Sequence, residues 1–143
     1  MRTQTLVAIL FISLQAALGA APVYRAIDSG FRDFRTTGAE AAVQEWSRNS
    51  NLLSGPGIVK LSNDIKAVQK SLGDCLGYEI MDSRPVGGGS TVVFASARFQ
   101  HGTLFFRFLV FDSYDSEILN GIAWSSDPLE VFPPQLFRKG GGS

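Results

Sequence analysis

The sequence contains one cysteine and one histidine in 143 residues, which excludes most chemistry built from these side chains. A single cysteine, Cys75, cannot form a disulfide within the chain, so we expect packing alone to hold the core. We interpret Cys75 as a small buried hydrophobic residue, with a reactive thiol or an intermolecular bridge as the alternative. The only histidine, His101, falls at a predicted hairpin tip, which is a poor place for a buried catalytic base. These residues favour a protein that is not an enzyme.

Motifs for charged ligands are also scarce. The 13 basic and 13 acidic residues balance, and no basic stripe of the kind that binds nucleic acid is visible. The glycine-rich stretch Gly87–Thr91 is followed by neither a lysine nor a helix, so it lacks the parts of a phosphate-binding loop. Asp112, Asp115 and Glu117 flank one predicted turn, where we expect them to be solvated rather than to bind calcium. The sequence predicts no metal and no cofactor.

The N-terminus has the three parts of a secretory leader. A charged start precedes the apolar run Leu6–Leu14 and then a run of small residues. The apolar run is too short to cross a bilayer core of about 30 Å as a helix. We predict that residues 1–20 are a signal peptide, with a buried N-terminal helix as the alternative. The mature protein would then be exported, periplasmic or secreted, with one domain over 21–138 and a flexible tail over 139–143.

Apolar residues recur at spacings of three and four over two stretches, which is typical of amphipathic helices. The first stretch, Tyr24–Ser47, is interrupted at Thr36-Thr37-Gly38, which predicts a kink or a break between two helical pieces. The second runs from Ile58 to Leu72, and Gly73 is placed to cap it. Its narrow apolar stripe predicts a helix on the surface.

Beyond residue 73 the pattern changes to strands. We predict strands at Tyr78–Arg84 and Glu117–Ser125, and a two-stranded hairpin across Ser90–Asp112. Gly121 predicts a bulge or a close backbone approach in the last strand. The segment Val131–Phe137 is expected to be extended, and the side chains expected to pack against the domain are Phe132, Leu136 and Phe137.

Helices followed by meandering strands predict the α+β class, with the N-terminal helices packed on one face of a curved antiparallel sheet of about four strands. Alternation predicts which strand residues share a face. In the first strand these are Tyr78, Ile80 and Asp82. In the last strand they are Ile118, Ile122 and Trp124.

The hairpin Ser90–Asp112 holds six of the eleven phenylalanines. A two-residue turn at His101-Gly102 would pair Gln100 with Thr103 and place Gly102 at a positive φ. Alternation then makes one face of the hairpin mixed and the other entirely apolar. The apolar face carries Val93, Ala95, Ala97, Phe99, Leu104, Phe106, Phe108 and Val110. We expect helices to cover it, because burial stabilises by about 25 cal/mol per Å² of apolar surface.

The mixed face holds the candidates for binding. Arg98 and Arg107 would lie close together on neighbouring strands, where forked hydrogen bonds could hold a carboxylate or phosphate. They could equally pair with acidic residues of a neighbouring strand or partner subunit, or keep the face soluble. An apolar patch ringed by arginine is also typical of a protein interface. The ligand or partner candidates are Arg98, Arg107, Phe94, Phe105 and Phe111.

Several short features accompany this order of elements: Gly38-Ala-Glu-Ala41 inside the first helix, Trp46 at its end, Tyr78-Glu79 opening the first strand, and Trp124 near the end of the last. With them the chain resembles the nuclear transport factor two-like superfamily, the cone-shaped α+β fold shared by ketosteroid isomerase and many small exported bacterial proteins. The resemblance implies a curved sheet wrapped round its helices, a pocket between them, and dimerisation through the outer face of the sheet. Such folds carry unrelated functions, so the resemblance assigns no activity.

Two hypotheses for function follow. The first is an exported, non-enzymatic module that binds itself or another protein through the mixed face. The second is a carrier of a small apolar ligand, or an isomerase-like enzyme, with a cavity of about 300 Å³ between helices and sheet. An isomerase needs ionisable groups inside that cavity, and the predicted interior of the hairpin has none. The residues expected to line such a cavity are Tyr24, Phe31, Trp46, Tyr78, Phe106 and Phe108.

Overall fold

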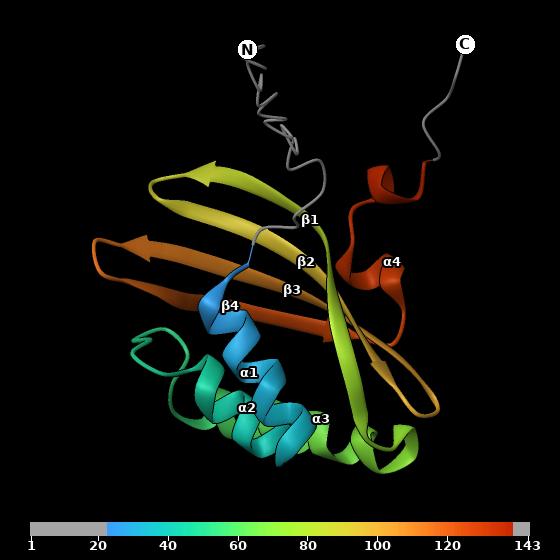
Figure 1. The fold of residues 1–143 in the computed structure, drawn as a ribbon. Coiled ribbons are helices and arrows are strands. Elements are labelled where there is room, and N and C mark those ends of the chain that lie inside the picture. Colours follow the sequence, from blue (N-terminus) through green and yellow to red (C-terminus); the bar gives the residue numbers. More distant parts are fainter. Residues whose placement is uncertain (1–22, 139–143) are drawn as a thin grey trace, which may run out of the picture.

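Three helices precede a four-stranded antiparallel sheet, and a short helix and a 3₁₀ turn follow it (Figure 1). The computed structural model describes residues 23–138, and the predicted signal peptide 1–20 and tail 139–143 lie outside them. The α+β class predicted from the sequence is confirmed. The elements are α1 (Arg25–Thr36), α2 (Ala39–Trp46), α3 (Pro56–Leu72), β1 (Cys75–Gly87), β2 (Ser90–Phe99), β3 (Gly102–Ser113), β4 (Ser116–Ser125), α4 (Pro128–Val131) and η1 (Pro134–Phe137).

The predicted interruption of the first helix is a complete break. Between α1 and α2 the chain turns at Thr37-Gly38, where Gly38 has a φ of 130°, a conformation that favours glycine. The backbone N–H of Ala39 then donates to Oε1 of Gln69 on α3, which satisfies one of the free donors at the start of α2. None of the helices within residues 23–138 is long and apolar enough to cross a membrane.

The predicted apolar face of the hairpin lies against α1 and α2, and we call it the inner face. Its eight side chains are all 3% exposed or less, so this assignment is confirmed. Helix α1 contributes Ile27, Phe31 and Phe34 to the same core, and α2 contributes Val43 and Trp46. Helix α3 buries Ile65 fully and leaves its other apolar residues partly exposed, as its narrow stripe predicts.

Helices α1 and α2 cross at Gly30. A Cβ atom added to this residue would lie 1.9 Å from Nε1 of Trp46. The indole N–H of Trp46 donates to the carbonyl oxygen of Ile27 at 3.3 Å, one turn earlier in α1. A glycine is therefore required here because the indole ring lies directly on the backbone of α1.

The predicted turn of the central hairpin was placed two residues out of register. Phe99 pairs with Gly102, so the loop is Gln100-His101 and Gly102 does not have a positive φ. Two bonds from outside the hairpin hold this loop: the N–H of His101 donates to the carbonyl of Leu72 (2.9 Å) and that of Gln100 to Asp74 (3.2 Å). A shift of two residues keeps every side chain on its predicted face, because the strand repeat is two.

Bulges in the outer strands change the predicted phase. In β1 the register shifts between Ile80 and Asp82, so Ile80 faces inward whereas Asp82 pairs with Phe94 on the opposite face. In β4 the shift beside Gly121 makes Leu119, and not Ile118, the buried residue. The bulge that Gly121 predicted is confirmed, but grouping Asp82 with Ile80, and Ile118 with Ile122, was wrong. An extra residue reverses the alternation beyond it.

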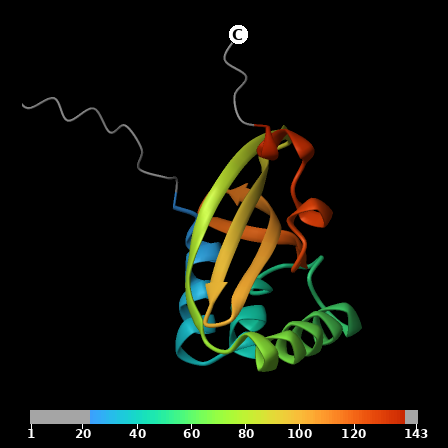
Figure 2. The same ribbon diagram turned by 90° about the vertical axis from the view of Figure 1, so that its right-hand side faces the viewer.

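The chain after β4 crosses the face of the sheet that points away from α1 and α2, which we call the outer face. Figure 2 shows α1 and α2 on one side of the sheet and the C-terminal segment on the other. The sequence predicted an extended segment, but only Phe132 and Pro133 are extended, between α4 and η1. We call residues 128–137 the strap.

Candidate functional site

The two arginines of the outer face lie apart. Arg98 of β2 pairs with Thr103 of β3, and Arg107 of β3 pairs with Phe94 of β2. Four residues along a strand correspond to about 13 Å, so the two guanidinium groups cannot form the single forked site expected from the sequence. Arg107 instead donates from Nη1 to the carbonyl of Val131 in the strap (3.5 Å).

The strap covers two of the three candidate phenylalanines. The ring of Phe132 lies 5.7 Å from that of Phe94 and 5.4 Å from that of Phe105, edge to face in both pairs. Phe94 is 5% exposed and Phe132 6% exposed. With Val131 these side chains form a second hydrophobic cluster, separate from the core under α1 and α2.

Polar contacts fix the start of the strap. The hydroxyl of Ser125 at the end of β4 donates to Glu130 (2.6 Å) and accepts from the backbone N–H of Asp127 (3.0 Å). Asp127 caps α4 by accepting from the N–H of Leu129 at 2.9 Å. The route of the chain onto the outer face is therefore set by Ser125 and Asp127.

One end of the outer face stays uncovered and forms an open hollow of about 410 Å³. Arg98 lies in it as an exposed side chain without an acidic partner within 4 Å among residues 23–138. Leu76, the extra residue of a bulge in β1, is 47% exposed in the same hollow. The lining is completed by Gly77, Tyr78, Glu79, Ser96 and Thr103. A cation, an anion, the hydroxyls of Ser96 and Thr103 and an apolar side chain are thus presented together, while the hydroxyl of Tyr78 is bonded to Asp28.

Phe111 lies toward the opposite end of the outer face from Arg98. It pairs with Ser90 and with Ile118, and its ring lies beside Gly89 in the β1–β2 turn. The five candidates from the sequence are therefore divided among three places. Arg98 is in the hollow, Phe111 is near the β1–β2 turn, and Phe94, Phe105 and Arg107 are at the strap.

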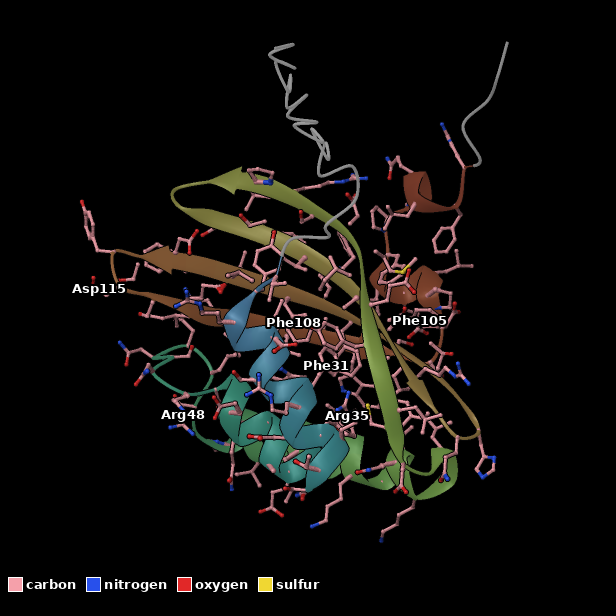
Figure 3. The ribbon with its side chains drawn as sticks, viewed as in Figure 1. Phe31, Arg35, Arg48, Phe105, Phe108 and Asp115 are labelled. Carbon is pink, nitrogen blue, oxygen red and sulfur yellow. The ribbon has the colours of Figure 1, made fainter. Side chains whose placement is uncertain are left out.

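Aromatic side chains fill the space between the helices and the inner face. Trp46 contacts Phe31, Phe106 and Phe108 at ring distances of 4.9, 5.5 and 5.3 Å. Figure 3 shows Phe31 and Phe108 gathered between α1 and the sheet, with Phe105 beside α4. All four of the buried cavity candidates, Phe31, Trp46, Phe106 and Phe108, are therefore packed against one another.

The other two cavity candidates lie at the margin of this core. Tyr24 is half-buried before α1, and Tyr78 stacks on Phe31 at 4.4 Å. The hydroxyl of Tyr78 donates to Asp28 at 2.8 Å, next to a hollow of about 90 Å³. Burial, and then this hydrogen bond, raise the pKa of Tyr78 above its ordinary value. Tyr78 is therefore a neutral donor at physiological pH.

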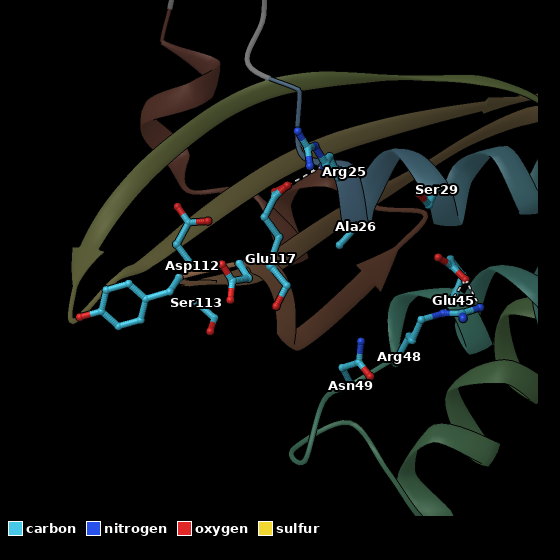
Figure 4. Close-up of a pocket in the computed structure, with 12 residues that line it drawn as sticks. Arg25, Ala26, Ser29, Glu45, Arg48, Asn49, Asp112, Ser113 and Glu117 are labelled. Atoms are coloured by element: carbon cyan, nitrogen blue, oxygen red, sulfur yellow. Dashed lines mark hydrogen bonds and ion pairs between the residues drawn. The ribbon is translucent and has the colours of Figure 1, made fainter.

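A polar cleft of about 590 Å³ lies where the start of α1 meets the β3–β4 turn (Figure 4). Glu117 on β4 accepts the backbone N–H of Arg25 at 2.6 Å and so caps α1 from another element. On the other wall Arg48 is paired with Glu45 at 2.6 Å. Oε2, the other carboxylate oxygen of Glu117, is buried without a hydrogen-bond partner within residues 23–138, so the charges of this mixed-charge cleft are only partly paired. No pattern in the sequence indicates the Glu117 cap, because it joins residues 92 positions apart.

The remaining chemical candidates stand alone. His101 is exposed at the loop tip, and Cys75 is buried at 4% exposure with its thiol near the carbonyl of Gly77. Burial raises the pKa of the Cys75 thiol. No three His, Cys, Asp or Glu side chains in the described part of the chain are grouped as a metal ion requires.

A comparison of the chain with protein-family models, with curated proteins and with solved structures finds no match.

Proposed function

We propose that the chain is an exported, non-enzymatic binding module that associates with a protein partner through the outer face of its sheet. The observation that carries the proposal is the exposed Arg98 in the uncovered hollow, beside the exposed side chain of Leu76. The filled aromatic core argues against the alternative, a small-ligand carrier or isomerase, because the predicted cavity residues occupy that space themselves. Export and membership of the nuclear transport factor two-like superfamily stay predictions of the sequence.

The charges of the hollow fit a second copy of the chain as the partner. Glu79 pairs with Ser96, and Arg98 with Gly77, so one anion and one cation lie diagonally on neighbouring strands. In a two-fold dimer each contact occurs twice in reciprocal form. Arg98 of one copy can then meet Glu79 of the other on both sides of the axis, with the two Leu76 side chains between them. The surface is thus complementary to itself.

Sedimentation velocity on the mature chain, from micromolar to millimolar concentration, tests this association. We expect a dimer, and we expect Arg98→Glu or Glu79→Arg alone to weaken it at least about tenfold because like charges then face each other. The combined variant, Arg98→Glu with Glu79→Arg, should restore it. A wild-type chain that remains monomeric throughout this range would contradict the proposal.

A matched pair of substitutions separates the hollow from general surface hydrophobicity. Leu76 and Val59 are both exposed apolar residues, at 47% and 59%, but Val59 lies on α3 away from the outer face. Leu76→Asp should weaken the dimer, whereas Val59→Asp should not. Equal effects of the two changes would place the association elsewhere on the molecule.

A further inference from the structure

We propose that the slot between Phe94 and Phe105 is a peptide-binding site that the strap occupies in its own chain. In our proposal, a proline-containing segment of another protein, with an aromatic residue directly before a proline, binds there in place of the strap. This inference shares with the proposed function only the premise that the outer face binds proteins. It uses a different part of that face, so the two can fail separately.

The strap docks in the way a bound peptide does. One aromatic side chain, Phe132, enters between two phenylalanines of the sheet, and a neighbouring backbone carbonyl, that of Val131, accepts from Arg107. The strap adds no strand to the sheet, which has four strands in the order β1-β2-β3-β4. An anchor residue and a single backbone contact are enough to fix the register of an extended ligand.

The backbone of the strap identifies the class of partner. Phe132 has φ −96° and ψ 141°, and Pro133 has φ −68° and ψ 147°. Pro133 has the angles of the polyproline II conformation, and Phe132 is extended, with a φ about 20° from the polyproline II value. Proline-containing segments in this conformation bind aromatic-lined grooves with a small loss of chain entropy, because the proline ring has already fixed φ. A partner segment with the same order, an aromatic residue and then proline, meets the same slot.

The strap can leave without opening the main core. Its buried residues belong to the second hydrophobic cluster, with Phe94, whereas α1, α2 and the inner face form the separate main core. The link from β4 is short and exposed at Ser126 and Asp127. Two of its large apolar side chains remain exposed where it lies, Leu129 at 69% and Phe137 at 45%. The strap is therefore a peripheral segment whose buried anchors are Val131 and Phe132.

A tethered strap competes strongly with a free peptide. A short linker gives an effective concentration of the order of 1 mM, so a free peptide of equal intrinsic affinity must approach that concentration to displace half of it. Removing the anchor of the strap should therefore raise the apparent affinity for added peptide by at least about tenfold. This prediction distinguishes a binding slot from ordinary packing.

The test uses a fluorescent peptide of residues 127–138 and the mature chain carrying Phe132→Ala. Anisotropy should show binding to this variant at least tenfold tighter than to the wild-type chain, and a peptide with alanine in place of Phe132 should not bind. Arg107→Ala, added to the variant, should weaken binding, whereas Arg98→Ala should leave it unchanged. The Arg98 control also separates this site from the proposed dimer surface.

Several outcomes would overturn the inference. A folded Phe132→Ala chain that does not bind the peptide at millimolar concentration would do so, as would equal binding of the alanine peptide. Peptide-displaceable dimers of the wild-type chain, lost in Phe132→Ala, would instead indicate exchange of straps between two copies. If the variant does not fold, hydrogen exchange on the wild-type chain decides: strap amides must exchange faster than those of β2 and β3, and equal protection would refute a displaceable strap.

Discussion

Replacing Gly30 by alanine should destabilise the protein, although the same change usually stabilises a helix. In a helix interior, alanine is favoured over glycine by up to about 1 kcal/mol. At Gly30 the new methyl group would lie 1.9 Å from Nε1 of Trp46, far inside the roughly 3.5 Å of an ordinary contact. The indole cannot move aside, because Trp46 is 1% exposed and packs against Phe106 and Phe108.

The loss of stability can be estimated from the contacts that the new methyl group would disrupt. Overpacking a core typically costs about 1 to 3 kcal/mol, and separating α1 from α2 also removes the hydrogen bond from Trp46 to Ile27, worth about 1 kcal/mol. We expect the free energy of unfolding to fall by about 3 kcal/mol. With a urea dependence of about 1 to 3 kcal/mol per molar, the midpoint should fall by roughly 1 to 3 M.

Gly57 supplies the matched control. It also lies in a helix, α3, but a Cβ atom added there meets nothing within 4 Å. Gly57→Ala should therefore leave the stability unchanged or raise it by about 0.5 kcal/mol. Urea unfolding followed by far-ultraviolet circular dichroism compares the two variants. If Gly30→Ala were as stable as Gly57→Ala, the indole of Trp46 could not lie directly on Gly30 of α1 as the structure has it.

A double-mutant cycle identifies the clash itself. Trp46→Phe alone should destabilise, because it removes buried surface and the bond to Ile27. Combined with Gly30→Ala, it should cost less than the sum of the two single changes, since the smaller ring leaves room for the methyl group. Additive effects would mean that Gly30→Ala destabilises through something other than Trp46.

Two further predictions concern single titratable groups. Because the pKa of Tyr78 is raised by burial and the bond to Asp28, folded Tyr78 keeps its proton at a pH where unfolded tyrosine, with a pKa of about 10, has lost it. The free energy of unfolding should therefore decrease as the pH rises above about 10. Tyr78→Phe should reduce that decrease in urea titrations, and an unchanged slope would contradict the raised pKa of Tyr78. Cys75, buried and with a raised pKa, should react with a disulfide reagent at least about 100-fold more slowly in the native than in the unfolded chain, and equal rates would show that the thiol is accessible.

The sequence predicted the inner face correctly because alternation survives an error in register. The hairpin was predicted two residues out of step, yet Phe106 and Phe108 still face the helices, since an even shift returns each side chain to its side. The predicted closeness of Arg98 and Arg107 was wrong, because the distance between them depends on the register. A candidate site built from two residues on different strands depends on the register as well as on the face, and here a contact with Leu72 at the end of α3 sets the register.

Odd shifts had the opposite effect. The extra residues in β1 and β4 moved Asp82 and Ile118 to the other side of the sheet. Gly121 predicted the bulge in β4, but no glycine or proline lies at the bulge in β1 between Ile80 and Asp82. The sequence did not predict the crossing of α1 and α2 at Gly30. A glycine within a helical pattern indicates only a position of low helix propensity, and it does not reveal that the indole of Trp46 lies against it.

The outer phenylalanines show why a partner was expected on the face that the strap covers. A sheet with helices on one side needs no aromatic residues on the other, so Phe94 and Phe105 pointed to a second contact. The sequence placed Phe132 against the domain but could not say on which face, because nothing local records where a chain goes after its last strand. The contact expected for Phe94 and Phe105 is made by Phe132 of the same chain. Arg98 in the hollow and Phe132 in the slot are therefore the residues at which binding of an outside partner can be tested.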